Sequence, residues 1–296
     1  MINRAGLGIA CGLSAAALYG LVPNFTRAGF VNGIPPIEST LIRTSAVIVI
    51  FAIIAVLRSE TLRVPRAAVP SFIGQTVATL MVSVGYLASV QFIPVGLAVI
   101  IFFFFPVLIM LLAPAAEGRN PGISRILIGL AAFVGLAIAV GPSFETLDIR
   151  GVLLAVMATI GAVMQFFTGR SISRYMTPSV FGCLVHLAIW PAILAIALTV
   201  GSGTLQFMPG GTGTPMGLAF MAGLGAVYVV SYMMQMLSLR FVSASIVAPF
   251  YNLEPVVTTG IAAVILGERL LINQYAGGGL VLAALVASSL IGRWKT

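Results

Sequence analysis

The chain has 296 residues, of which 60% are hydrophobic and only 7% are charged, with a formal net charge of +8. A soluble domain carries about 25% charged residues, so this chain cannot cover its surface in water and its solvent must be lipid. The charges lie in short gaps between apolar runs and form no basic patch with interleaved aromatic residues. The composition therefore excludes a soluble domain, and we expect no nucleic-acid partner.

The sequence offers few residues for metal binding, disulfide formation or catalysis. Cys11 and Cys183 both fall inside apolar segments and are interpreted as small buried hydrophobes. One histidine and two cysteines make no metal-ligand cluster, so we expect no metal and no cofactor. A membrane-embedded enzyme would need a nucleophile with a base, paired acids or a metal. We therefore expect that the protein is not an enzyme.

Apolar runs long enough to cross a bilayer follow one another along the chain. A hydrocarbon core about 30 Å thick needs about 20 apolar residues per helix. The first run is too long for a typical signal peptide, and we interpret it as an uncleaved first helix. The sequence predicts an all-α integral membrane protein with ten spans. They are 6–27, 36–57, 68–90, 93–114, 122–141, 149–170, 177–200, 214–237, 243–265 and 274–291.

Lysines and arginines indicate the orientation of these spans. With a cytoplasmic N-terminus, eleven of them fall in inside segments and three in outside segments, while Arg43 lies within a span. The positive-inside rule therefore predicts that both termini are cytoplasmic. The inside residues are Arg4, Arg58, Arg63, Arg66, Arg119, Arg125, Arg170, Arg174, Arg240, Arg293 and Lys295, and the outside residues are Arg27, Arg150 and Arg269.

The two halves of the chain repeat one another. A shift of 149 residues places Phe92 on Phe241, Pro106 on Pro255 and, with a slip of about two residues, Glu117 near Glu268. Earlier in each half, a shift of 143 residues places Gly8 on Gly151, Arg27 on Arg170, Pro35 on Pro178 and Arg43 on His186. Because five spans is an odd number, the second copy enters the membrane from the opposite side.

The sequence thus predicts two inverted five-helix repeats, 1–141 and 142–296. Such repeats are typical of alternating access, with a substrate site near the midplane of the membrane. Duplication without transport is the alternative.

Two spans carry polar side chains along one helix face. The third span has Gln75, Thr79, Ser83 and Tyr86, and the eighth segment has Tyr228, Ser231, Tyr232, Gln235 and Ser238. The repeat shift relates the two stripes. Lipid cannot satisfy these groups, so we favour a wet cavity between the repeats. Interhelical hydrogen bonding is the alternative.

Other polar residues near the expected cavity are candidates for substrate contact. Asn24 follows Pro23 near the outer end of the first span, where it could cap freed backbone or contact substrate. Gln165 lies near the inner end of the sixth span, and Asn252 precedes the acidic residue of the ninth. We include all three in the candidate site.

Arg43 and His186 are ionisable residues within spans and are equivalent by the repeat shift. An intramembrane charge costs about 2.5–3.5 kcal/mol on insertion scales, so each needs a partner or a function. We expect Arg43 to reach outward to Glu38, about one turn along the same helix. We expect His186 to be hydrogen-bonded. Coupling or gating is the alternative role for both residues.

Glu254 lies at the middle of the ninth span, about 16 Å from either end at 1.5 Å per residue. Desolvation at that depth favours the neutral carboxyl. Within a continuous helix Pro255 would leave the carbonyl of Tyr251 unpaired, and a protonated Glu254 could donate to it. The functional alternative is proton coupling or binding of a substrate ammonium. We favour function, because the repeat partner of Glu254 is Phe105 and a symmetric scaffold would not require a carboxylate.

Three motifs resemble a known transporter family. The segment "NLEPVVTTGIAAVILGERLLINQYAGGGLVLAALV" is similar to the end of an EamA-type repeat of the drug/metabolite transporter superfamily, and "FFFFPVLIMLLAPAAEGR" repeats it more weakly. "LYGLVPNF" resembles the family pattern in the first span, with Tyr19 where tryptophan is commoner. The resemblance covers essentially the whole chain.

The resemblance implies ten helices in two inverted repeats, arranged in the shape of a basket with a central cavity, and export of small metabolites across the inner, cytoplasmic membrane. Members include exporters of amino acids, among them aromatic ones. It also implies that the Glu-Pro of Glu254 and Pro255 serves the fold or gating across the family. Glycines such as Gly277 to Gly279 fit close helix packing.

The leading prediction is therefore a small-metabolite exporter acting by alternating access, with aromatic or other amphipathic amino acids as expected substrates. Tyr86, Tyr228 and Tyr232 suit such molecules. The expected partners are a small-molecule substrate and the lipid bilayer, with coupling to protons left open and no required protein partner. Alternatives are a multidrug or other metabolite exporter, a passive facilitator, a non-transporting subunit and, most distantly, a membrane-embedded enzyme.

Overall fold

The computed structural model describes residues 4–118, 122–141, 148–200, 204–266 and 271–293, and every regular element within these ranges is a helix. The first half contains α1 (Arg4–Tyr19), α2 (Val22–Val31), α3 (Pro36–Leu57), η1 (Arg66–Ala68), α4 (Val69–Ser89), α5 (Val95–Phe102), α6 (Phe105–Glu117) and α7 (Ile123–Val140). The second half contains α8 (Ile149–Ile172), α9 (Pro178–Val200), α10 (Pro215–Phe241), α11 (Ala244–Val247), η2 (Ala248–Asn252), α12 (Leu253–Leu266) and α13 (Ile272–Arg293).

These helices confirm the predicted all-α membrane fold. Grouped by the expected spans they form ten segments, whose ends lie within four residues of the predicted ones. Eight segments are long and apolar enough by themselves to cross a membrane, counting Arg4–Val31 as one. The ninth falls outside this group because α11, η2 and α12 divide it into short pieces. The tenth contributes the shorter apolar helix Ile272–Ala287.

Three segments are interrupted, and each has a proline just after its break. Pro23 and Pro106 lie at the start of α2 and α6. Pro255 lies in the first turn of α12, which follows η2 directly. The first turn of a helix has no intrahelical acceptor for its N–H groups, so proline costs little there. The prediction that Pro255 interrupts a continuous helix is therefore wrong: the helix begins at Leu253.

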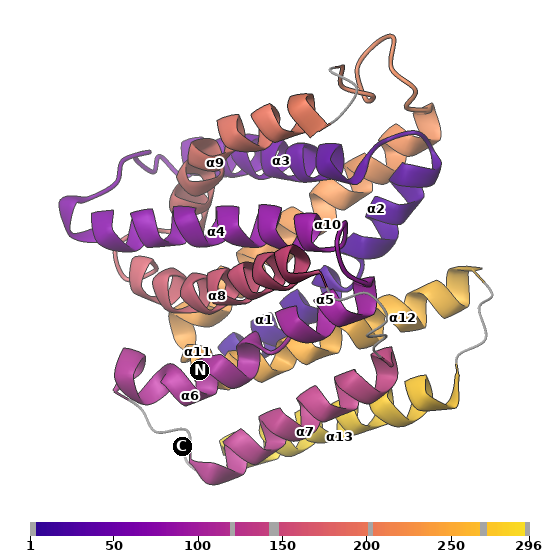
Figure 1. Cartoon of the computed structure of the whole chain (residues 1–296). Helices are drawn as coiled ribbons and strands as arrows, with labels where there is room; N and C mark the ends of the chain where they lie inside the picture. The colour runs from indigo at the N-terminus through magenta and orange to yellow at the C-terminus, as the bar shows by residue number, and fades with distance from the viewer. Residues whose placement is uncertain (1–3, 119–121, 142–147, 201–203, 267–270, 294–296) are drawn as a thin grey trace.

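Helix packing has the symmetry of two inverted repeats. The most extensive interfaces are formed by four helix pairs, α4 with α8, α1 with α10, α3 with α9 and α7 with α13. The repeat relates the α4–α8 pair to the α1–α10 pair. It relates each of the other two pairs to itself. Figure 1 shows α3 beside α9 at one side of the bundle and α7 beside α13 at the other. Gly8 packs against Phe241 and Val242, as Gly151 packs against Phe92 and Ile93. These paired contacts match the residue shifts seen in the sequence.

Backbone approaches most closely between α7 and α13. A Cβ at Gly277 would clash with the Gly135 carbonyl oxygen and with the backbone of Ala139. A Cβ at Gly279 would meet nothing within 4 Å. Of the glycines expected to serve close packing, Gly277 therefore does so and Gly279 does not.

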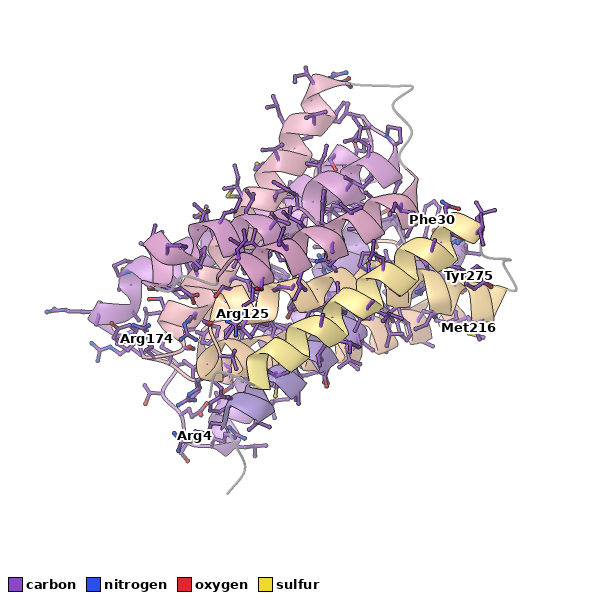
Figure 2. All side chains as sticks on the ribbon, turned by 90° about the horizontal axis from the view of Figure 1, so that it is seen from below. Arg4, Phe30, Arg125, Arg174, Met216 and Tyr275 are labelled. Carbon is purple, nitrogen blue, oxygen red and sulfur yellow. The ribbon has the colours of Figure 1, made fainter. Side chains whose placement is uncertain are left out.

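The two ends of the bundle differ in charge. Figure 2 shows Arg4, Arg125 and Arg174 toward one end and Phe30, Met216 and Tyr275 at the opposite end. The chain begins α1 and finishes α13 at the same end of the bundle (Figure 1). The arginines are thus segregated as the loop charges predicted. We call the two faces the arginine-rich end and the opposite end.

Candidate functional site

The interrupted segments meet at the centre of the molecule. Helix α1 contacts η2 and α12, and η2 also contacts α6. Gly20 permits this approach, because a Cβ there would lie 2.7 Å from the backbone oxygen of Glu254. Broken helices at the junction of two inverted repeats are the usual location of a transporter's substrate site, since the freed backbone and nearby side chains face one another there.

Asn24 and Thr258 satisfy the backbone freed by these breaks. The Asn24 side-chain amide donates to the carbonyl of Thr258 at 3.2 Å and to that of Gly20 at 3.4 Å. The Thr258 hydroxyl lies 2.8 Å from the Gly20 carbonyl oxygen and 2.9 Å from that of Glu254. The structure thus shows Asn24 in the capping role, while substrate contact by Asn24 stays a prediction. Thr258 was missed, although it lies one turn after Glu254 on the same helix.

Glu254 is half-buried, and no described residue donates a hydrogen bond to its carboxylate. The carboxylate is within electrostatic reach of the hydroxyls of Tyr19, Tyr86 and Tyr251. It also interacts with the charge of Arg43 without forming an ion pair. The expected hydrogen bond from Glu254 to the Tyr251 carbonyl does not form, because the chain there is already a 3₁₀ turn.

Arg43 lies against an aromatic ring. Its guanidinium carbon is 4.8 Å from the centroid of the Tyr228 ring, a cation–π distance. The prediction that Arg43 reaches Glu38 is wrong, because the Glu38 carboxylate accepts hydrogen bonds from the backbone N–H groups of Gln206 and Phe207 at 2.8 and 3.3 Å. The Arg43 guanidinium is half-buried and has no hydrogen bond to any described residue.

His186 approaches the same tyrosines from α9. Its ring centroid lies 4.8 Å from that of Tyr232 and 6.0 Å from that of Tyr228. Its Nδ1 hydrogen-bonds the Gly182 carbonyl at 2.8 Å, while its buried Nε2 has no partner in the part of the chain that the structure describes. The expectation of a hydrogen-bonded histidine is thus met at one nitrogen. Arg43 and His186, equivalent by sequence, both contact Tyr228.

Aromatic rings continue from these residues across the centre. Tyr19 lies 5.8 Å from Tyr228 and 6.1 Å from Tyr251, measured between ring centroids. The Tyr251 ring in turn lies 5.0 Å from Phe166 and 6.2 Å from Phe105. Tyr19 and Tyr251 were not among the predicted site residues. Their positions in the sequence could have indicated them, since Tyr251 lies one turn before Glu254 and Tyr19 directly precedes the first break.

The polar stripe of α4 is hydrogen-bonded to α8. The Thr168 hydroxyl donates to the Gln75 side-chain oxygen at 2.6 Å, and the Gln165 side chain donates to the Thr79 hydroxyl at 3.2 Å. Gln75, Thr79 and Ser83 are all buried. The structure therefore shows the interhelical role for Gln75, Thr79 and Gln165, and substrate contact by the stripe stays a prediction.

The stripe of α10 includes both satisfied and unsatisfied groups. Gln235 accepts a hydrogen bond from the Tyr19 hydroxyl at 2.9 Å, which joins α10 to α1. The buried Tyr251 hydroxyl, by contrast, has no hydrogen-bond partner among the described residues, and the Tyr232 hydroxyl lies near the Gln75 side chain. Asn252 donates to the Pro249 carbonyl at 3.3 Å, but its side-chain oxygen is unpartnered. Buried polar groups without partners are costly, so a bound molecule or water would stabilise them.

The geometry thus defines a membrane-embedded protein of two inverted repeats, with opposite charges and tyrosines at its centre. The EamA-like transporter family matches residues 6–141 and 149–290, and the chain belongs to this family. The fold is also shared with solved structures. For one crystal structure the TM-score is 0.81, with 15% sequence identity over 97% of this chain and 98% of the other, which shows the fold alone. No curated protein matches the chain.

Proposed function

We propose that the protein exports amino acids, aromatic or otherwise amphipathic, by alternating access, as the bacterial aromatic amino acid exporters do. The observation that carries the proposal is the pair of unbonded charges, Arg43 and Glu254, set among tyrosines at the junction of the repeats. A zwitterion supplies the opposite charge to each. The Arg43 guanidinium would bind a carboxylate, and the Glu254 carboxylate an ammonium.

The tyrosine rings would hold the side chain of the substrate. The centroid of the Tyr19 ring lies 5.8 Å from that of Tyr228 and 6.1 Å from that of Tyr251. Aromatic walls favour apolar and aromatic side chains, while their hydroxyls accommodate the polar end. In the same proposal Gln75, Thr79, Ser83, Gln165, Tyr232, Gln235 and Asn252 line the path on either side.

Direction and coupling follow from the same arrangement. The arginine-rich end would face the cytoplasm, with both termini inside and the protein in the inner, cytoplasmic membrane. The repeats 1–141 and 142–296 would be the units that rock about the site. Glu254 is half-buried and unbonded, so it is the group suited to bind a proton when substrate leaves. A passive facilitator would use the same site without that step.

Uptake into proteoliposomes tests the proposal. Labelled aromatic, aliphatic, acidic and basic amino acids would be compared, with and without an imposed pH gradient. Two aromatic analogues sharpen the test: an amine that lacks the carboxylate and an acid that lacks the ammonium. We expect saturable uptake of the aromatic amino acids and at least about tenfold weaker competition by either analogue, because each leaves one charge unpaired.

The outcomes separate the alternatives. Uptake that follows the pH gradient means a proton antiporter, and uptake that ignores it means a facilitator. Competition by both analogues at full strength would overturn zwitterion recognition. Uptake of unrelated amphipathic compounds, but of no amino acid, would favour a multidrug or other metabolite exporter.

A further inference from the structure

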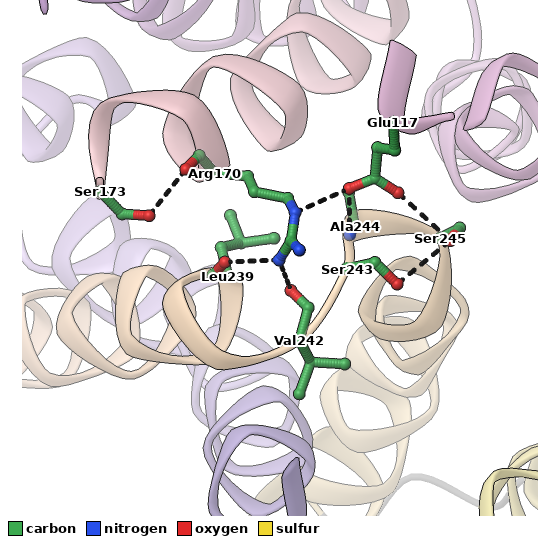
Figure 3. Close-up of polar contacts among 8 residues, drawn as sticks. All are labelled: Glu117, Arg170, Ser173, Leu239, Val242, Ser243, Ala244 and Ser245. Atoms are coloured by element: carbon green, nitrogen blue, oxygen red, sulfur yellow. Dashed lines mark hydrogen bonds and ion pairs between the residues drawn. The ribbon is translucent and has the colours of Figure 1, made fainter. Parts of the chain in front are cut away.

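An ion pair joins the two repeats at the arginine-rich end of the molecule. The Glu117 carboxylate, at the last residue of α6, lies 3.1 Å from the Arg170 side chain near the end of α8. Figure 3 shows that Arg170 also donates to the carbonyls of Leu239 and Val242, where α10 ends. Arg170 therefore ties α6 to α8 and to the end of α10 at once.

The same carboxylate holds the start of the interrupted ninth segment. Its oxygens accept hydrogen bonds from the Ala244 N–H at 3.0 Å and the Ser245 hydroxyl at 3.3 Å. The Glu117 side chain is only 6% exposed, and that of Arg170 is 22% exposed. Breaking such a pair would leave a nearly buried carboxylate uncompensated, so the network strongly favours the conformation in which it forms. We call these residues the Glu117–Arg170 clamp.

The packing of α6 around the clamp is not repeated between the described helices at the opposite end. Helix α6 contacts both α11 and η2 extensively. The repeat relates α6 to α12, and it relates α11 with η2 to α5. Within the described residues, α12 and α5 form no comparable interface. In Figure 1, α12 and α2 diverge toward the opposite end of the bundle. Among the described helices, the arginine-rich end thus has an interface that α5 and α12 do not form at the opposite end.

We propose that the Glu117–Arg170 clamp is a gate that closes the arginine-rich end of the protein and must open once in every transport cycle. This inference rests on the proposed alternating access. In a protein of two inverted repeats, opening one end is achieved by exchanging the conformations of the repeats, so the opposite end closes.

Thiol labelling tests the gate without any substrate. Cys11 and Cys183, both buried, would first be replaced by alanine. One reporter is Ser243→Cys, buried beside the clamp, and the other is Pro94→Cys, its equivalent at the opposite end by the shift of 149 residues. Each reporter would be combined with Glu117→Gln, which keeps the side-chain shape but removes the charge. The labelling rate with a polar maleimide would be measured in detergent.

A gate predicts reciprocal changes in the two reporters. Glu117→Gln should raise the labelling rate of Ser243→Cys by about tenfold and lower that of Pro94→Cys, because one population shift moves both ends. Arg170→Gln should act alike, and combining both substitutions should add little, since each removes the same interaction. Arg58→Gln is the matched control, because the Arg58 side chain is exposed and forms no ion pair with a described residue.

The outcomes distinguish a gate from an ion pair that stabilises only its immediate surroundings. Faster labelling of Ser243→Cys with no change at Pro94→Cys would mean local loosening only, and would overturn the gate. Unchanged rates at both positions would overturn it too. Melting temperature and gel filtration identify variants that fail to fold, and Glu117→Asp then supplies a milder change in the same assay. Reciprocal labelling in a protein that transports no amino acid would retain the gate and reject the proposed substrate.

Discussion

In the first repeat Gly8 packs against Val242 of the second, and in the second repeat Gly151 packs against Ile93 of the first. At the centre this equivalence ends. The residue related to Glu254 is Phe105, and the residue related to Arg43 is His186. The helix packing, which we call the frame, is therefore formed twice by equivalent contacts. The charges of the candidate site, Arg43 and Glu254, each occur in one repeat only.

The difference separates what the repeat must preserve from what it can change. Helix crossings such as those at Gly8 and Gly151 depend on a small residue at an equivalent position along each helix, so both repeats keep the same crossing geometry. A substrate is not symmetric, and one with an ammonium at one end and a carboxylate at the other requires different partners at related positions. We expect substitutions in the frame to unfold the protein, and substitutions at the centre to leave it folded but inactive.

The largest effect is expected from breaking the frame at Gly277. Gly277→Val would force side-chain atoms into the backbone of Gly135 and Ala139, where α7 and α13 touch. Overpacking a tight interface costs about 3 kcal/mol, and contact with backbone cannot be relieved by a rotamer change. Melting temperature in detergent measures the loss. The matched control is Gly279→Val, which enters open space two residues along the same helix. Equal destabilisation by both would contradict the packing argument.

The next largest effect is expected at the centre. Arg43→Gln and Glu254→Gln should each lower the uptake efficiency by about 100-fold, because each removes a charge that would pair with the substrate. The melting temperature should change little, since neither charged group has a hydrogen bond to a described residue that it could lose. Arg150→Gln serves as the control for removing an arginine.

Glu254→Gln also tests coupling. If protons drive transport through this carboxyl, residual uptake by the variant should no longer respond to a pH gradient. A variant that retains full proton-dependent transport would show that Glu254 has no coupling role. Lower uptake with an unchanged gradient response would assign Glu254 to substrate binding alone.

A smaller effect is expected in the polar stripe of α4. Thr168→Val removes the hydrogen bond to the Gln75 side chain. Interhelical hydrogen bonds in membrane proteins contribute about 0.6 kcal/mol on average, so the melting temperature should fall slightly. Thr199→Val is the control, because the exposed Thr199 hydroxyl bonds only to backbone of its own helix. A large loss of uptake with unchanged stability would instead place the stripe in the substrate path.

The smallest effect is expected at the exposed ion pair of Asp148 and Arg150. Hydrogen bonds from Arg150 hold the pKa of Asp148 below its usual value. A carboxyl whose pKa is lowered by folding stabilises the protein above its unfolded pKa of about 3.9, and that contribution is lost as the pH falls through the folded value. Arg150→Gln should therefore differ slightly from wild type at neutral pH and converge toward it in acid, down to the pH-independent contribution of the Arg150 contact with the Phe92 ring. Melting temperatures across this pH range check the convergence.

Several parts of the candidate site followed from the sequence alone. The charged and aromatic residues were recognisable because a polar side chain inside an apolar run is conspicuous without knowledge of its neighbours. Arg43, Glu254 and Tyr228 were found in this way, and the structure brings them together at one place. Their contacts were less predictable. Glu38 binds a loop that is distant in sequence, so the expected pairing with Arg43 failed.

The amino-acid sequence by itself determined the ten segments and the inverted repeat, and it predicted their orientation in the membrane. Run length, loop charge and internal similarity are properties of the linear chain, so no tertiary information was needed. The tertiary structure decided where the helices break, which backbone carbonyls Asn24 and Thr258 satisfy, and that Glu117 meets Arg170. Those features depend on the rotation and crossing of helices that lie far apart in the chain, and only packing fixes both.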